Sequence, residues 1–153
     1  MKAEEKLKEM GIVLPACPKP VAAYIPGAVT DSKLVFLSGQ TAKKDGEPYL
    51  TGKAGKDLSA EEAYQAARGC ALMLLAEMKA VLGDLELVDK IVKVNGYVNS
   101  APDFTEQPKV INGASEFFEQ VFGERGKHAR TAIGVAALPE NASVEVEVII
   151  QKK

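Results

Sequence analysis

The chain has 153 residues, of which 46% are apolar and 26% charged, and its formal net charge is −2. This length suits a single domain over residues 1–153, with residues 1–20 as an N-terminal extension, and the composition argues against intrinsic disorder and against a general affinity for nucleic acid. No apolar run reaches bilayer length and the first ten residues lack the apolar stretch of a secretory signal, so we expect a cytoplasmic protein with no membrane partner.

The first third of the chain is predicted to be mostly irregular. Residues 4–10 can form one or two amphipathic helical turns, and an extended segment is expected around 22–25. The sequence KLVFLSGQTA, residues 33–42, has the β-branched and aromatic content of a strand. Residues 43–57 carry glycines and lysines in turn-like order, which predicts an exposed, hairpin-like excursion or loop.

A helix over about 60–82 gives the strongest local signal. Ser59 and Glu62 match a capping box, and apolar residues then recur at three- and four-residue spacing until Gly83. Cys70 lies on this apolar face, so we expect it to be a small core residue. The other cysteine, Cys17, lies in a proline-rich loop, and the two together indicate neither a disulfide framework nor a metal site.

The second half of the chain alternates between strands and a helix. Residues 90–98 have strand periodicity, with Val92, Val94 and Val98 expected on one face. A helix over about 105–122 follows, with Pro108 tolerated in its first turn.

Two final strands are expected over 130–137 and 143–151. In the last strand, the valines face one way and Glu145 and Glu147 face the other. The resulting β-β-α-β-α-β-β order predicts an α+β fold with two helices packed on one face of a mixed sheet. Because the other sheet face then needs cover, we expect the chain to form an oligomer.

Arg130 and Glu145 are the polar residues that a purely structural account explains least well. If the last two strands form a hairpin, Arg130 and Glu145 lie on neighbouring strands. An arginine binds a small carboxylate well, and a nearby carboxylate can hold a water or act as a general base. The alternative is a structural ion pair between the two residues, which the pattern alone favours.

Other candidate residues are weaker when taken alone. His128 is the only histidine and lies in the basic run ERGKHAR, where a loop histidine is a better interpretation than a general base. The same run could meet a phosphate, but without interleaved aromatic residues the case for RNA is weak. Tyr24 could be a packing ring, and residues 38–40 could be a turn at the end of a strand.

Five motifs, in this order along the chain, resemble the Rid/YjgF family of reactive-intermediate imine deaminases, which also carries the name L-PSP endoribonuclease. The motifs are Y-x-x-G at 24–27, LVFLSGQ at 34–40, NGYVNSAPDF at 95–104, HARTAIGVAALP at 128–139 and VEVEVI at 144–149. The resemblance runs over essentially the whole chain, and the N-terminal sequence EEKLKEMGIVLP looks like that of a less characterised branch.

The resemblance implies a chorismate-mutase-like α+β fold and a homotrimer with its sites in the clefts between subunits. The reaction it implies is hydrolysis of enamines and imines, such as 2-aminoacrylate and 2-iminopropanoate, to 2-oxo acids and ammonia without a metal or organic cofactor. The expected partners are therefore a small carboxylate-bearing imine or 2-oxo acid and further copies of the chain, rather than nucleic acid. A non-catalytic module that binds small carboxylates in the same cleft is the alternative, and ribonuclease activity ranks last.

The resemblance also assigns roles to individual residues. Arg130 would bind the carboxylate of the imino acid, helped by a backbone N–H near Ala132, and Glu145 would position the attacking water. Tyr24 and Ser38 would line the cleft, and Gly39 would let the backbone approach closely. Asn112 is also expected to bind the substrate, although it matches the family's asparagine in the second helix only with a shift of one residue. Ala132 stands where the deaminase branch often has cysteine.

Overall fold

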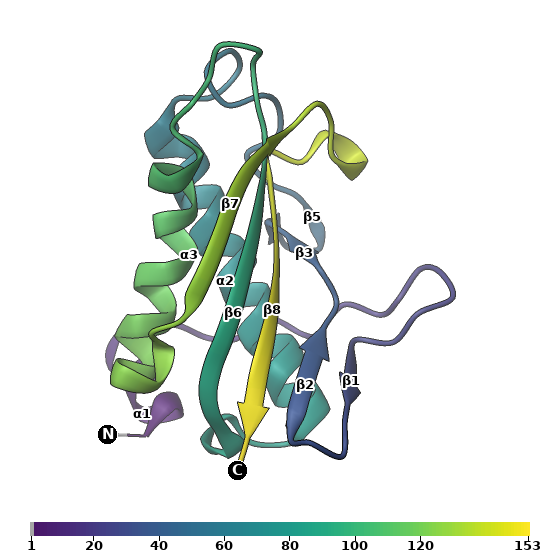
Figure 1. The fold of residues 1–153 in the computed structure, drawn as a ribbon, viewed down its shortest axis with the longest axis vertical. Helices are drawn as coiled ribbons and strands as arrows, with labels where there is room; N and C mark the ends of the chain where they lie inside the picture. Colours follow the sequence, from purple (N-terminus) through teal and green to yellow (C-terminus); the bar gives the residue numbers. More distant parts are fainter. Residues whose placement is uncertain (1) are drawn as a thin grey trace.

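Two long helices, α2 (Ala60–Leu82) and α3 (Gln107–Phe122), cover one face of a mixed sheet in the computed structural model, which describes residues 2–153 (Figure 1). Both helices agree with the prediction to within two residues. Ser59 Oγ accepts a hydrogen bond from the Glu62 N–H, and the Glu62 side chain accepts one from the Ser59 N–H. The predicted capping box is therefore confirmed, and it fixes where α2 begins.

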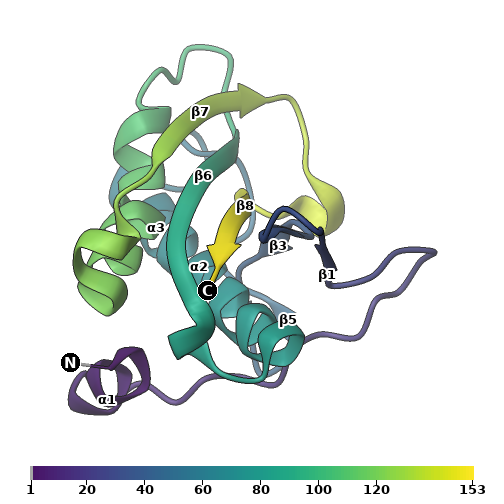
Figure 2. The same ribbon diagram turned by 60° about the horizontal axis from the view of Figure 1, so that its bottom comes forward.

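The main sheet has the order β1-β2-β8-β6-β7, and β3 also pairs with β8. Its strands are β1 (Gly27–Val29), β2 (Leu34–Leu37), β3 (Gln40–Thr41), β6 (Val88–Asn99), β7 (Ala129–Val135) and β8 (Val144–Lys152). Only β6 and β7 pair in parallel, because α3 forms the crossover between them. The predicted α+β class with two helices on one face is confirmed, and Figure 2 shows both helices on the same side of the sheet.

A small hairpin and a short N-terminal helix lie outside the main sheet and the two long helices. The excursion predicted over 43–57 contains the small hairpin β4 (Lys43–Lys44) and β5 (Glu47–Pro48). The N-terminal helix α1 (Ala3–Glu9) buries Ala3 and Leu7 and adds them to the core. Among residues 2–153, no helix has the length and apolar character needed to cross a bilayer.

The pairing expected between the last two strands is wrong. The two strands have about the predicted bounds, but β6 lies between β7 and β8 and pairs with both. The connection from β7 to β8 is longer than a hairpin turn, and Glu140 and Asn141 within it have positive φ angles of 57° and 55°. This connection carries the chain past the end of β6, so β8 pairs with the edge of β6 opposite to the one that pairs with β7.

Two smaller expectations also need correction. The first strand begins at Gly27 rather than around 22–25, a segment flanked by Pro20 and Pro26, which have no N–H to donate to a sheet. In β6, Val94 and Val98 are buried as predicted, but Val92 is only half-buried. The register with β8 shifts between Ile91 and Lys93, so this irregularity buries Ile91 in place of Val92.

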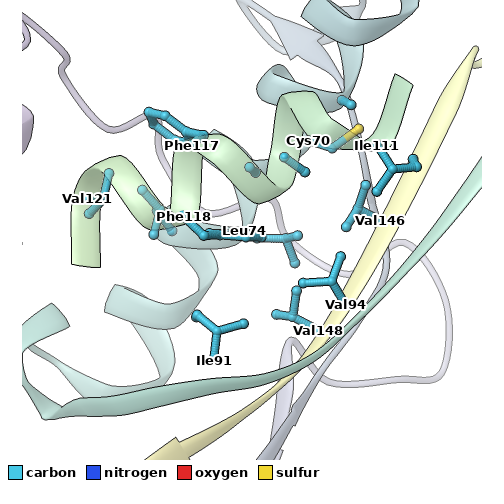
Figure 3. Packing of buried hydrophobic residues seen from close by; sticks show 14 of the residues in the cluster. Cys70, Leu74, Ile91, Val94, Ile111, Phe117, Phe118, Val121, Val146 and Val148 are labelled. Atoms are coloured by element: carbon cyan, nitrogen blue, oxygen red, sulfur yellow. The ribbon is translucent and has the colours of Figure 1, made fainter. Parts of the chain in front are cut away.

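The core fills the space between the helices and the sheet (Figure 3). Cys70, Leu74 and Phe118 from the helices meet Val94 and Val146 from the sheet, and all five are fully buried. Cys70 is therefore the core residue that the sequence predicted, and its thiol donates to the carbonyl of Val144 at 3.4 Å.

The opposite face of the sheet lacks such cover in a single chain. Phe36 and Ile133 are each 44% exposed, and Tyr97 lies opposite Glu145 in the sheet. The Tyr97 hydroxyl donates to Glu147 Oε1 at 2.6 Å. The expectation that a second copy covers this face stays a prediction.

Helices α2 and α3 approach most closely at Gly113. A Cβ placed there would lie 2.0 Å from the carbonyl oxygen of Tyr64, which is a backbone atom of α2. We expect Gly113→Ala to lower the free energy of unfolding by about 1–3 kcal/mol, because the clash outweighs the better helix propensity of alanine. Denaturant titration measures this change.

Gly69→Ala is the matched control, because its Cβ would meet mainly the Ala42 side chain at 3.2 Å. A change within about 1 kcal/mol is expected at this position. Equal effects of the two substitutions would contradict the close approach at Gly113.

Candidate functional site

Arg130 reaches from β7 toward α3. Its register partner Val94 is buried against the helices, so the Arg130 side chain leaves the sheet on the same side. The guanidinium donates to Asn112 Oδ1 at 2.7 Å, to Ser115 Oγ at 3.2 Å and to the carbonyl oxygen of Pro108 at 3.3 Å. Helix α3 thus supplies all three acceptors and fixes the orientation of the guanidinium.

All three acceptors of Arg130 are neutral. Within residues 2–153 no carboxylate forms a salt bridge with this guanidinium, so the suggested ion pair between Arg130 and Glu145 does not form in the chain. Partial burial lowers the pKa of Arg130, but an arginine stays charged at any physiological pH. The result is a positioned cation that is available to a ligand carboxylate.

His128 holds the acceptor Ser115 in place. Nδ1 of His128 lies 2.6 Å from the carbonyl oxygen of Gly126, so Nδ1 carries the proton and donates. Nε2 is then the acceptor, and the Ser115 hydroxyl, 2.9 Å away, donates to it. Ser115 can therefore present its lone pair to Arg130. Burial lowers the pKa of His128, which favours this neutral form.

These side chains surround an open hollow of about 330 Å³, which we call the arginine hollow. It is lined by Asn112, Ser115, Glu116, Glu119, Gly126, Lys127, His128 and Arg130. The hollow therefore combines one unpaired guanidinium with neutral hydrogen-bonding groups and a rim of charged residues.

In the basic run at 124–130, the two cations that precede Arg130 already contact acidic side chains. Lys127 Nζ lies 2.6 Å from Glu124 and 4.0 Å from Glu119. Arg125 lies 3.7 Å from Glu86 and donates to the carbonyl oxygen of Val88 at 2.6 Å. Lys127 and Arg125 are thus each close to a carboxylate of the same chain, and the expectation that nucleic acid is not a partner stays a prediction.

A second hollow, of about 370 Å³, contains Tyr24, Gly39 and Glu145, and we call it the glutamate hollow. Its full lining is Pro18, Lys19, Pro20, Val21, Tyr24, Pro26, Gly39, Gln40, Thr41, Lys43, Glu77, Pro139, Glu140 and Glu145. Burial, and then the charge of Glu147, raise the pKa of Glu145 above its usual range. A carboxylate whose pKa is raised in this way is a better proton acceptor.

Gly39 is required by the closeness of Glu145. A Cβ at position 39 would lie 2.5 Å from Oε1 of Glu145, so only glycine leaves the carboxyl group its place. The Ser38 hydroxyl donates to the carbonyl oxygen of Ile25 at 2.6 Å, and Ser38 is not part of this hollow's lining. This bond ties down the segment that carries Tyr24. The expected place of Ser38 in a cleft between subunits stays a prediction.

The arginine and glutamate hollows do not meet in one chain. Arg130 points to the helix side of the sheet, whereas Glu145 points to the other side, and β6 separates their strands. The hypothesis that the two residues face each other across a hairpin is therefore wrong. Ala132 lies on β7 opposite Gly96, on the same side as Arg130, but it lines neither hollow.

Sequence reasoning missed Ser115 and Glu77. Ser115 follows Asn112 by three residues, so both lie on the helix face that meets Arg130, and this spacing is a signal that could have identified it. Glu77 lies directly beside Met78 in the apolar periodicity of α2, where a charged residue is unexpected.

Comparisons with known proteins give consistent results. The family model described as endoribonuclease L-PSP matches residues 15–152. The chain is 45% identical to Protein TCP17 of Trypanosoma cruzi, over 95% of this chain and 91% of that protein. It is 33% identical to the 2-iminobutanoate/2-iminopropanoate deaminase of Dermatophagoides farinae, over 91% of this chain and 93% of that protein.

The fold is also similar to that of a solved structure. The crystal structure of Atu1372 from Agrobacterium tumefaciens, a protein of unknown function, superimposes with a TM-score of 0.92 at 43% identity, over 99% of this chain and 92% of that chain.

The buried neutral His128 should make the stability of the protein depend on pH. Its pKa in the folded chain lies below the 6.5 of an unperturbed histidine, so the unfolded chain takes up the proton first as the pH falls. We expect the free energy of unfolding to decrease below about pH 6.5, and to decrease less in His128→Gln. Unfolding titrations of both proteins between about pH 7.5 and 5.5 measure the difference.

The other titrating groups are common to the two proteins, so subtracting the curves isolates the contribution of His128. Parallel curves would contradict the inferred tautomer and its hydrogen bonds.

Proposed function

Because the chain belongs to the endoribonuclease L-PSP family, also called Rid/YjgF, we propose that it hydrolyses reactive enamines and imines of the 2-aminoacrylate and 2-iminopropanoate type to 2-oxo acids and ammonia. The observation that carries this proposal is the guanidinium of Arg130, which α3 orients and no carboxylate neutralises within the described chain. The deaminase name of the relative from Dermatophagoides farinae supports it.

Arg130 would bind the carboxylate of the imino acid. A guanidinium offers two parallel N–H donors to a carboxylate, and this charge-assisted pairing fixes the plane of the substrate. β7 is the edge strand of the sheet, so its outer backbone groups face no further described strand, and an N–H near Ala132 can supply another donor. Asn112 and Ser115 would act by holding the guanidinium rather than by touching the substrate.

Glu145 would position the water and accept its proton. The carbon of a protonated imine is already electrophilic, so oriented water is sufficient and no protein nucleophile is needed. The water oxygen adds to this carbon, and one water proton passes through the carboxyl group to the nitrogen. The C–N bond of the resulting carbinolamine then breaks as the carboxylate takes the remaining hydroxyl proton, which releases ammonia and the 2-oxo acid. The raised pKa of Glu145 suits a group that takes up a proton and returns it.

The cleft would be completed between copies of the chain. A second copy that brings its glutamate hollow against the arginine hollow of the first would unite two groups that diverge within one chain. The exposed Phe36 and Ile133 give such a copy an apolar surface to cover. We therefore infer a homotrimer in which each cleft receives Arg130 from one subunit and Tyr24, Gly39 and Glu145 from the next.

A module that binds small carboxylates without chemistry remains the alternative, because an unpaired Arg130 would serve it equally well. RNA cleavage has less support, since acidic partners and backbone carbonyls already engage the basic neighbours of Arg130. Thermal stabilisation by 2-oxo acids, without any turnover of several imines above the buffer rate, would favour the binding module.

Arg130→Ala is expected to reduce kcat/KM for 2-iminopropanoate by about tenfold to a hundredfold, because a charge-assisted contact worth about 1.5–3 kcal/mol is lost. The imine is generated in situ and ammonia release above the buffer rate is measured. Lys127→Ala is the matched control, since it removes a cation from the same hollow that already pairs with Glu124. Undiminished turnover in Arg130→Ala would exclude the proposed role of this residue.

Mixing two impaired variants tests whether the cleft is shared between subunits. Arg130→Ala and Glu145→Gln trimers should each be at least about tenfold less active than the wild type, but after subunit exchange at equal concentrations about a quarter of the clefts carry both intact residues. Ammonia release should therefore recover to about a quarter of the wild-type rate. No recovery in mixtures shown by mass spectrometry to contain mixed trimers would contradict a shared cleft.

Sedimentation of the wild-type chain tests the assembly itself, and a trimer at micromolar concentration is expected. A monomer would overturn the shared cleft.

A further inference from the structure

Glu77 is a charged residue buried in the middle of the core helix α2. It is 1% exposed, and its Oε1 accepts a hydrogen bond from Gln40 Nε2 at 3.0 Å. Its Oε2 is also buried and has no hydrogen-bond partner among the described residues. An unpaired carboxyl oxygen in a protein interior is costly, so its retention calls for a partner from outside the chain.

Glu77 and Gln40 both line the glutamate hollow, together with the proposed catalytic residue Glu145. The other titratable or charged groups that line the hollow are Lys19, Tyr24, Lys43 and Glu140. Lys43 is already paired with Glu140 at 3.3 Å, and Lys19 is exposed. Cys17 also lies near Glu77, because the charge of Glu77 contributes, after burial, to raising the pKa of the Cys17 thiol.

The hollow offers more room than a three-carbon imino acid needs. Its volume of about 370 Å³ compares with about 30 Å³ for one water in the liquid. A substrate whose reacting carbon lies at Glu145 therefore leaves space for a longer side chain within the same hollow. Gln40 and Glu77 belong to the wall that such a side chain would meet.

Building on the proposed function, we propose that Glu77 is the specificity-determining residue of the cleft, and that its unpartnered oxygen binds the cationic end of the substrate's side chain. The substrate class is then imino acids whose side chain ends in an ammonium or guanidinium group. Arg130 holds the carboxylate at one end of such a molecule, and Glu77 holds the cation at the other.

The unpaired oxygen of Glu77 favours a cationic side chain over the other possible ones. An aliphatic side chain would leave Oε2 of Glu77 unpaired, and an anionic one would bring no donor to Oε2 and would lie beside the carboxyl group of Glu145. A cation supplies a hydrogen-bond donor to Oε2, and its charge stabilises the ionised form of Glu77. Burial raises the pKa of Glu77 to about 8, so the group is mostly neutral at pH 7 and releases a proton when a cation binds beside it.

The experiment compares two imines generated in situ by an amino-acid oxidase, one from arginine and one from leucine. We expect the wild-type protein to favour the guanidinium-bearing imine in kcat/KM, and Glu77→Gln to reduce the ratio of the two values at least tenfold. Glu140→Gln is the matched control, because it removes a carboxylate from the same hollow, and it should leave the ratio unchanged. An equal preference in Glu77→Gln and wild type would overturn the inference.

A binding measurement on the wild-type protein needs no variant and no turnover. Calorimetry at pH 7 in buffers of different ionisation enthalpy should show release of about one proton with the 2-oxo acid of arginine and none with that of leucine. The role of Glu77 would be overturned if the 2-oxo acid of leucine bound as tightly as that of arginine. It would also be overturned if the 2-oxo acid of arginine bound without proton release.

The two measurements separate this inference from the proposed function. Failure to hydrolyse any imine, combined with proton-linked binding of the guanidinium ligand, would reject the deaminase and keep the Glu77 site. Hydrolysis of both imines without a preference would keep the deaminase and reject the site.

Discussion

The alternation of side chains along the central pair of strands, β6 and β8, is the constraint on which the rest of the molecule depends. Because successive residues of a strand point to opposite faces, the same run of β8 that buries Val144, Val146 and Val148 must present Glu145 and Glu147 on the other side. The hydrophobic energy that seats the helices on the sheet thereby holds the carboxylates out of the core. A shift of one residue would exchange the two sets and destroy both features.

The local periodicity predicts most of the fold, and long-range pairing accounts for the errors. Helix α2 could be located from its capping box and apolar spacing, since both signals lie within the helix itself. The position of β8 between β2 and β6 could not, because nothing within residues 143–151 specifies which strand they pair with. The shift in β6 register that buries Ile91 depends likewise on the partner strand.

The same distinction applies to the candidate site. The family resemblance pointed to Arg130 and Glu145, but only the sheet order reveals that they face opposite sides. Glu77 escaped notice because a pattern of apolar spacing hides one polar residue among many buried ones, whereas its unpaired oxygen is a property of the folded chain. If Arg130 and Glu145 act in one site, as proposed, that site requires a second copy of the chain, because one chain presents the two residues on opposite faces of its sheet.

Helix α3 seats on α2 at Gly113, and this residue directly follows Asn112, the acceptor that lies nearest to the guanidinium of Arg130. The close contact between α2 and α3 thus helps to set how far the guanidinium of Arg130 lies from the sheet. At Gly113 the backbones of the two helices are in contact, because glycine has a hydrogen atom in place of a Cβ. This contact fixes the distance between α2 and α3. The position of the Arg130 guanidinium therefore depends on packing in the core as well as on its own hydrogen bonds.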